Sequence, residues 1–335
     1  MRPELSSEDR DILVKAAILA PSMHNTQPWK FRFHDHEIYV HRDPRRELGA
    51  EDPDGRLTLI GVGAAVFNLR VAAARLGWEA ATTLLPDRSQ PTLAAQISLE
   101  QGANGSADLA GLYPWLPRRR TNRFPFTGQP IPTSVREELA QAAHAEHVIL
   151  EWVEQDYRTR WLLELASDAD FADPDEPQRL AERQLWVGGE RTSDGIGSES
   201  LGPRAREPSA GVRDLAVDPA DRMRKAQRFE HLPVLAVLLT RHDSPADWLM
   251  AGQALQRVLL VATGHGLAAS LLNQPIEHKD LRWLVRDPRT GWAQAQSILR
   301  LGYGPEVPPT PRRSPEEFLL PGDSSDGPGV PDQSV

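Results

Sequence analysis

The chain has 335 residues, 40% hydrophobic and 25% charged, so it can fold around one large core or two smaller ones. Its 38 basic and 47 acidic residues give a net charge of −9, which argues against nucleic acid or an anionic membrane as the main partner. Because it contains no cysteine, disulfides, thiolate metal sites and a cysteine nucleophile are excluded. We expect a cytoplasmic protein, since residues 1–9 lack an apolar signal core and the longest apolar run, residues 234–239, is far shorter than the roughly 20 residues of a spanning helix.

The chain reads as a succession of helices and strands joined by a few loops rich in glycine and proline. Apolar residues at helical spacing predict helices over residues 12–20, 55–77 and 156–186, and onward from the capping residues Ser134 and Ser244. Alternating or continuous apolar runs predict strands at residues 30–33, 38–40, 82–85, 95–99, 148–153, 234–239 and 297–301. Residues 188–211 form a long loop, and we expect residues 321–335 to be a disordered tail.

The sequence Gly61-Val62-Gly63-Ala64-Ala65-Val66 resembles a dinucleotide-binding fingerprint. However, Val66 occupies the third glycine position, and the helical period continues through both glycines without a strand before them. We therefore interpret Gly61 and Gly63 as sites of close helix packing, and we do not predict a Rossmann dehydrogenase.

A polar loop between residues 20 and 29 joins the first predicted helix to the first predicted strand. It carries Ser22, His24, Asn25 and Gln27 between two prolines, which limit the backbone freedom of the segment. The spacing alone is compatible with a simple turn anchored by Trp29 or with a loop that binds a ligand.

The pattern Ser22-x-x-Asn25-x-Gln27-Pro28-Trp29 resembles the flavin-contacting motif of the nitroreductase family, which are FMN-dependent NAD(P)H oxidoreductases. Within the family, the Acg-like actinobacterial branch is the most similar, and matching segments extend from about residue 5 to residue 313. The resemblance implies an α+β nitroreductase-like fold with a central mixed or antiparallel sheet. It also implies a bound FMN and the reduction of nitroaromatic or quinone-like acceptors, with hydride passing through flavin N5.

The two halves of the chain resemble each other. Residues 63–80 align with residues 252–269, which pairs Gly63 with Gly252 and Gly77 with Gly266. Ordinary members of the family that this chain resembles are homodimers with FMN across the interface, but here the polar loop occurs only in the first half and the basic segment only in the second. The resemblance to the fused Acg-like branch therefore implies a pseudo-dimer with halves at residues 1–115 and 116–320 that binds one FMN per chain, and it leaves open whether the chain is self-associating.

The resemblance assigns the FMN phosphate to two basic groups, since guanidinium groups suit phosphate oxygens. The first group is in the connector between the halves and the second follows the last strand: Arg119, Arg120, Thr121 and Arg123, with Arg312 and Arg313. The alternative is that both groups are solvated surface charge, which is the usual fate of arginine runs.

The resemblance also implies contacts to the ribityl chain and the flavin ring. The polar loop would supply them through Pro21, Ser22, Met23, His24, Asn25 and Gln27, although Gln27 could instead brace the loop. A backbone N–H facing N5 would come from Leu272, Asn273 or Gln274, unless this segment is only a turn capped by Asn273. No spacing indicates a metal site, and flavin chemistry needs no protein base, so we expect no catalytic side chain.

Residues 186–197 resemble the lid of the Acg-like branch, which folds over the flavin, and they open the long loop 188–211. Gly197 stands where that branch usually has proline, so the lid could be looser. A lid that opens admits NAD(P)H and permits turnover, whereas a permanently closed lid would make a flavin-sequestering protein without activity.

Overall fold

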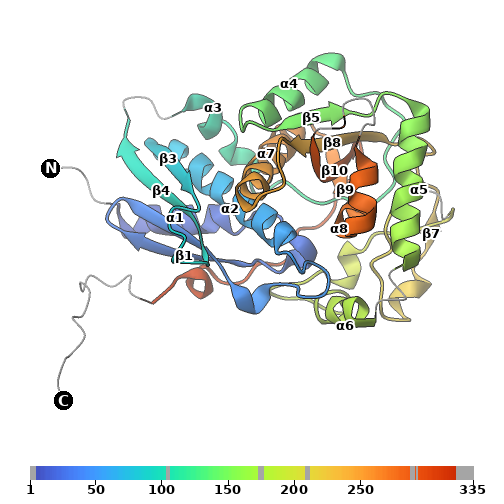
Figure 1. Ribbon diagram of the computed structural model, residues 1–335, viewed down its shortest axis with the longest axis horizontal. Coiled ribbons are helices and arrows are strands. Elements are labelled where there is room, and N and C mark those ends of the chain that lie inside the picture. The colour runs from blue at the N-terminus through green and yellow to red at the C-terminus, as the bar shows by residue number, and fades with distance from the viewer. Residues whose placement is uncertain are drawn as a thin grey trace.

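Figure 1 shows the computed structural model of the protein, which describes residues 5–102, 106–172, 177–207, 212–286, 291 and 293–321. The predicted tail, apart from residue 321, and the last four residues of the predicted loop 188–211 lie outside the described residues. Helices surround two separate antiparallel sheets, so the predicted α+β class is confirmed, with two sheets of four strands where one central sheet was expected.

The first half of the chain forms one four-stranded sheet and two main helices. Ser6 caps the first helix, because its side chain accepts a hydrogen bond from the Asp9 N–H at 3.0 Å. The sheet has the order β1-β2-β4-β3 and is antiparallel throughout. Its elements are α1 (Ser7–Ala17), β1 (Trp29–His34), β2 (Glu37–Arg42), α2 (Arg56–Arg75), β3 (Trp78–Leu84) and β4 (Leu93–Gln101).

The second half repeats this arrangement with an insertion. Its sheet has the order β5-β8-β10-β9, and one long helix again lies between the second and third strands of the sequence. The repeated elements are α4 (Thr133–His144), β5 (Ile149–Trp152), β8 (Val234–Thr240), α7 (Pro245–Gly264), β9 (Ala268–Leu271) and β10 (Gln294–Gly302). This shared connectivity supports the predicted duplication, which itself stays an inference.

The insertion separates β5 from β8 and holds the remaining larger elements. It contains α5 (Asp156–Ala172), α6 (Pro177–Trp186) and a short parallel pair, β6 (Arg204–Ala205) and β7 (Ala226–Gln227). Short helices complete the fold: α3 (Ala107–Ala110), α8 (Gln274–Glu277) and α9 (Lys279–Arg282).

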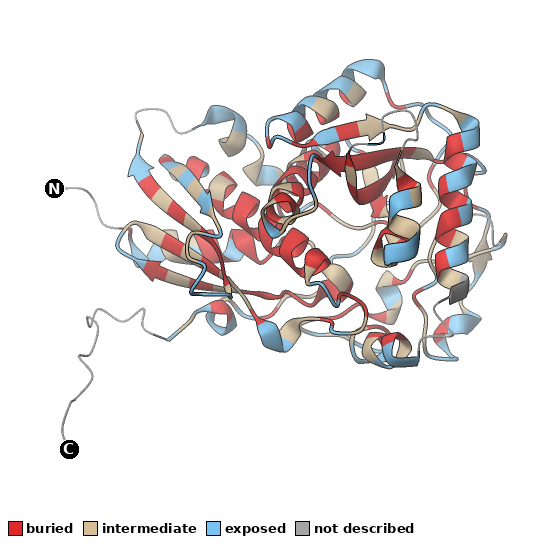
Figure 2. Cartoon of the chain, in the orientation of Figure 1, coloured by how far each residue is buried: buried red, intermediate tan, exposed pale blue. Residues whose placement is uncertain are grey.

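Helices α2 and α7 cross at the centre of the molecule, where Figure 2 shows both as largely buried. A Cβ on Gly63 would lie 2.2 Å from the Leu249 carbonyl oxygen, and a Cβ on Gly252 would lie 2.0 Å from that of Ile60. Only glycine permits this reciprocal approach of the two backbones. The packing role predicted for Gly63 is confirmed, and α2 runs unbroken through it without a preceding strand.

Helix α2 is also the one helix among the described residues that is long and apolar enough to cross a membrane, with a mean hydropathy of 1.7 over its most apolar window. That window is 94% buried within the protein, as expected of a core helix.

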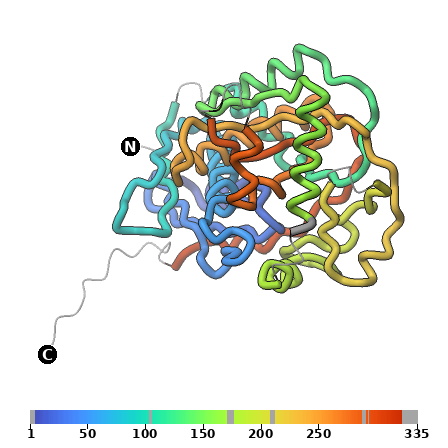
Figure 3. Tube along the Cα trace, turned by 45° about the vertical axis from the view of Figure 1, so that its right-hand side comes forward, coloured from blue at the N-terminus to red at the C-terminus, as the bar shows by residue number. Residues whose placement is uncertain are grey.

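After β10 the chain returns to the first half, as the red end of the trace in Figure 3 shows. Phe318 is fully buried, with its ring centre 6.4 Å from that of Phe31 in β1, and the Leu320 N–H donates to the Phe31 carbonyl at 2.9 Å. The last residues assigned from sequence to the second half therefore pack against the first. This return brings the C-terminal arginines to the polar loop.

Candidate functional site

The polar loop after α1 is held in an unusual backbone conformation. His24, Asn25 and Gln27 have φ values of 47°, 57° and 51°, in the left-handed region that residues other than glycine rarely adopt. Such conformations cost about 1–3 kcal/mol each and persist where surrounding contacts enforce them. One such contact is internal, since the Gln27 N–H donates to the Ser22 hydroxyl at 2.9 Å.

An inner cavity of about 140 Å³ lies beside this loop, between α2 and α7. Apolar side chains from both halves form much of its wall, and a few polar groups interrupt them. The lining comprises Pro21, Ser22, Met23, His24, Leu57, Ile60, Gly61, Thr121, Arg123, Val212, Arg213, Leu215, Leu255, Ser270, Leu271, Leu272, Asn273, Gln274 and Glu277. It is therefore a small, mostly apolar site built by both halves and by the insertion.

A second cavity of about 280 Å³, the arginine cavity, adjoins the first. The two cavities share Pro21, Ser22 and Thr121 in their linings. The other residues of the arginine cavity are Leu19, Asn25, Leu116, Pro117, Arg119, Arg120, Pro308, Pro309, Thr310 and Arg312. A mostly apolar site thus lies next to a cationic one.

The three arginines of this second cavity lack carboxylate partners. Among the described residues none of Arg119, Arg120 and Arg312 forms a salt bridge, and Arg119, only 5% exposed, has Nε and Nη1 without any acceptor. Burial and then the charges of Arg312 and Arg120 lower the pKa of Arg119 to about 9. Burial likewise lowers the pKa of Arg312 to about 10. Buried cations without counter-charge are costly, so an anion is the natural complement of this cavity.

The chain is similar over nearly its whole length to known proteins, although no family model matches it. It is 32% identical over 323 residues to "Putative NAD(P)H nitroreductase acg" of Mycobacterium tuberculosis, covering 91% of this chain and 93% of that protein. It is 31% identical over 321 residues to "Putative NAD(P)H nitroreductase Rv3131" of the same species, covering 90% of each. The chain belongs to the NAD(P)H nitroreductase family. The predicted membership, and with it the expectation of an oxidoreductase, is confirmed.

Solved structures give only a loose likeness. A crystal structure of a nitroreductase with bound FMN from Bacteroides fragilis covers 61% of this chain and 93% of its own, with 15% identity and a TM-score of 0.38. We draw no conclusion from it.

The predicted phosphate residues of this nitroreductase divide between different places. Arg119, Arg120, Thr121 and Arg312 line the arginine cavity. Arg123 lines only the inner cavity, and its Nη1 donates to the Ser200 carbonyl at 3.1 Å. Arg313 lines neither cavity: its Nη2 donates to the Gln27 carbonyl at 3.0 Å and its guanidinium lies 4.1 Å from the Phe318 ring centre. These positions do not support the predicted phosphate contacts of Arg123 and Arg313, which instead hold the lid and the polar loop.

The amide side chains of the loop are also committed to protein contacts. Asn25 Nδ2 donates to the carbonyls of Gly195 and Pro311 at 2.9 and 3.0 Å, while lining the arginine cavity. Gln27 Nε2 donates to the Ser193 carbonyl at 3.0 Å, and Gln27 lines neither cavity. Its predicted bracing role is the one its position favours.

The segment proposed to face N5 borders the inner cavity, but one of its amides is already used. The Leu272 N–H donates to the Ile298 carbonyl at 2.9 Å, which continues the pairing of β9 with β10. Asn273 Oδ1 accepts from the Ile298 N–H at 2.9 Å, so its side chain fixes the turn. The Leu272 N–H is thus already used within the sheet, while Asn273 and Gln274 line the inner cavity.

The predicted lid lies against the polar loop, and residues that follow it line the inner cavity. The Gly195 N–H approaches the Asn25 carbonyl at 3.4 Å, and three later residues, Val212, Arg213 and Leu215, line the cavity. Gly195 has φ 74°, and a Cβ there would lie 2.6 Å from the Trp186 carbonyl. This turn of the lid therefore requires glycine.

A buried ionic cluster beside the inner cavity was not predicted from the sequence. His24 Nε2 lies 2.5 Å from Glu51 Oε2, and Glu51 also accepts from Arg183 Nε at 3.0 Å. Arg213 pairs with Glu277 at 2.8 Å. Burial alone would raise the pKa of Glu51, but the charges of His24, Arg183 and Arg213 outweigh it and hold that pKa far below its usual range. The sequence offers no signal for this cluster, because its members are brought together only by tertiary packing.

Proposed function

We propose that this nitroreductase binds one FMN, with the flavin ring in the inner cavity and the phosphate in the arginine cavity. The observation that supports this most directly is the junction of the two cavities at Pro21, Ser22 and Thr121. A ligand that is flat and apolar at one end and strongly anionic at the other matches such a pair of sites.

The residues of the arginine cavity fit the phosphate end. A phosphate monoester carries close to two negative charges at neutral pH and presents several acceptor oxygens. Arg119 has two buried nitrogen atoms without an acceptor among the described residues, and Arg120 and Arg312 add positive charge nearby. Binding an anion here would give Arg119 the hydrogen bonds it lacks.

The inner cavity would hold the ring end. Ile60 from α2 and Leu255 from α7 form apolar walls, and Val212 and Leu215, which follow the lid, add apolar surface. In this proposal the N–H groups of Asn273 and Gln274 bond the edge of the ring, since both residues line the inner cavity. When bound, FMN supplies the group that accepts and passes on hydride; the chain orients it and shields it.

We infer that NAD(P)H is the electron donor and a nitroaromatic or quinone-like compound the acceptor. The inner cavity has a volume of only about 140 Å³, Val212 and Leu215 just after the lid line it, and the lid is bonded to the polar loop beside it. The lid must therefore move before a nicotinamide or an acceptor can stack on the ring.

A second candidate is a flavin-sequestering protein, and the lid contacts favour it. Asn25, Gln27 and Arg123 all donate hydrogen bonds to lid carbonyls, so the lid is attached at several points. If these contacts never release, the protein would keep its flavin and perform no turnover.

Stopped-flow mixing of the purified, FMN-loaded protein with NADPH separates the two functions. The enzyme should lose its visible flavin absorbance on mixing and regain it when a nitroaromatic is added. A flavin band that persists under excess NADPH and NADH would support sequestration. A correctly folded protein that takes up no FMN would overturn both.

A further inference from the structure

A third cavity, which we call the outer cavity, lies next to the arginine cavity and has no role in the function proposed so far. Its volume is about 610 Å³, within the ~300–1,000 Å³ typical of small-molecule sites. Arg119 and Arg120 line both cavities, so they form a shared wall. The bridge between Thr121 and Ala269 lies between the outer and inner cavities, since Ala269 lines the former and Thr121 the latter.

The outer cavity is strongly cationic on one side. Arg118, Arg119 and Arg120 line it, against a single acidic residue, Glu306. Within the described part of the chain, none of these four side chains forms a salt bridge. The protein as a whole is negatively charged, with a net charge of −9, but the charge along this side of the outer cavity is positive. Such a positive region attracts anions and raises their local concentration. The Arg119 nitrogens without an acceptor lie in the wall shared with the arginine cavity, where the proposed function assigns them to the FMN phosphate, so the charge left for a second anion is that of Arg118 and Arg120.

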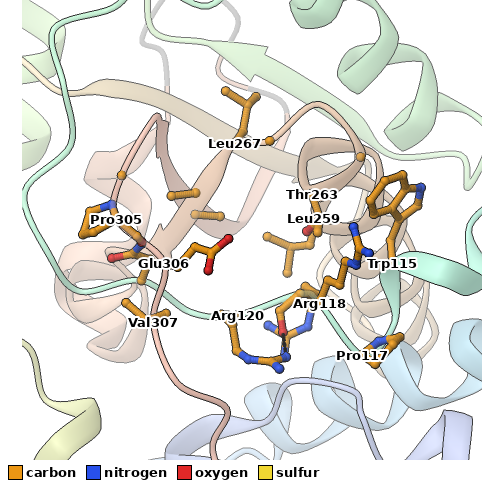
Figure 4. Close-up of a pocket in the computed structure, with 17 residues that line it drawn as sticks. Trp115, Pro117, Arg118, Arg120, Leu259, Thr263, Leu267, Pro305, Glu306 and Val307 are labelled. Carbon is orange, nitrogen blue, oxygen red and sulfur yellow. Dashed lines mark hydrogen bonds between the residues drawn. The ribbon is translucent and has the colours of Figure 1, made fainter.

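The other walls suit a flat ring and a sugar. Figure 4 shows Trp115 and Arg118 on one side of the cavity and Glu306, between Pro305 and Val307, on the other. The Trp115 indole packs closely against Gly264, where an added Cβ would lie only 3.2 Å from its Nε1. The Arg118 guanidinium lies 5.4 Å from the centre of the Trp115 ring. Small residues, including Gly266 and Ala268, leave the backbone accessible to a planar group.

We propose that the outer cavity binds a nucleoside phosphate. The phosphate would contact Arg118 and Arg120, the Glu306 carboxylate would accept hydrogen bonds from the sugar hydroxyls, and the base would pack against Trp115. Two ligands carry such a nucleoside phosphate. One is the nicotinamide donor, whose adenosine end would bind here; this case rests on the proposed function. The other is a free nucleotide that binds at this separate site.

Calorimetric titration of FMN-loaded protein with ADP tests this site directly. ADP should bind while the flavin stays bound, and Arg118→Ala should weaken the affinity by about tenfold or more, the loss of one charged hydrogen-bonding partner. Arg118 is exposed and lines only the outer cavity, so folding and FMN retention should be unchanged. Arg88→Ala, which removes an exposed arginine between β3 and β4, is the matched control and should bind ADP normally.

A second variant and a competition experiment complete the test. Glu306→Gln should weaken ADP binding but leave inorganic pyrophosphate binding unchanged, because only the sugar contacts this carboxylate. If ADP slows flavin reduction by NADPH competitively, the ligand is the donor's adenosine end; if reduction is unaffected, it is a free nucleotide. The proposal is wrong if ADP does not bind at millimolar concentration, if Arg118→Ala leaves its affinity intact, or if ADP displaces FMN. None of these binding results depends on turnover, so they are independent of whether the protein is an enzyme.

Discussion

His24 Nε2 lies 2.5 Å from Glu51 Oε2, with the two side chains only 3% and 0% exposed. His24 belongs to the polar loop that lines the inner cavity, whereas Glu51 precedes α2 and also pairs with Arg183 of the insertion. One buried carboxylate therefore ties the strained loop to the segment that carries the lid. Removing one partner from such a cluster leaves the others buried without compensation, which is more costly than the pair itself is worth.

Glu51→Gln should lower the free energy of unfolding by about 3–5 kcal/mol, because Arg183 and His24 would lose a charged partner in the interior. Urea unfolding of the purified variant measures this. Glu100→Gln, at an exposed position of β4, is the control and should change stability by less than about 0.5 kcal/mol. An equally small effect of Glu51→Gln would show that the cluster contributes nothing to folding.

Stability should also fall in acid in a way that depends on Glu51. The folded-state pKa of this carboxylate is held far below its unfolded value, so its contribution is complete above about pH 4.3, the ordinary value for glutamate, and is lost as the pH falls further. The unfolding free energy of the wild type should therefore decline more steeply between neutral and acid pH than that of Glu51→Gln. Parallel pH profiles of the two proteins would contradict this assignment.

Gly63→Ala should destabilise the protein strongly, since the new methyl group would lie 2.2 Å from the Leu249 carbonyl in the crossing of α2 and α7. Overpacking of this kind costs about 1–3 kcal/mol or more, and here backbone must move. Thermal unfolding checks it against Gly49→Ala, where a Cβ would meet no atom within 4 Å. A normal midpoint for Gly63→Ala would mean that the helices separate without cost.

Close helix packing at Gly63 could be predicted from sequence because its signal is local: the helical period continues through the glycines. Gly61, which received the same prediction, instead lies against Ser22 and lines the inner cavity. The polar loop could also be recognised from the sequence, since its residues are contiguous. Both features depend on neighbours in the chain.

The positions of the C-terminal arginines could not be predicted from local sequence patterns. Arg312 and Arg313 are adjacent in a segment without regular secondary structure, so no periodicity predicts where each side chain lies. Arg312 lines the arginine cavity while Arg313 donates hydrogen bonds to Gln27, and only the fold decides which does which. Glu51 and Arg183 are 132 residues apart, and no local pattern marks them as partners.

Arg119→Met should separate stability from cofactor binding. The apo-protein should be as stable as the wild type or more stable, because a buried cation with no counter-charge, and with acceptors for only one of its three nitrogens, is replaced by an apolar chain of similar length. FMN affinity should fall roughly 100-fold, since hydrogen bonds to charged groups contribute about 1.5–3 kcal/mol each. Fluorescence titration with FMN and thermal unfolding of the apo-protein measure the two effects. A variant that keeps full FMN affinity would remove Arg119 from the phosphate site.

Gly195→Ala should loosen the lid and so reveal whether the lid limits access. The substituted residue would be strained at φ 74°, and its Cβ would clash with the Trp186 carbonyl at 2.6 Å, which should displace the hydrogen bond from Asn25 to residue 195. If lid opening controls entry of the donor, the variant's flavin should be reduced by NADPH several-fold faster, and limited proteolysis should cut the lid more readily. Gly189→Ala is the matched control, because Gly189 has a similar positive φ, 67°, but an added Cβ would meet no atom within 4 Å. Faster proteolysis of Gly195→Ala with an unchanged reduction rate would show that the lid does not gate the donor.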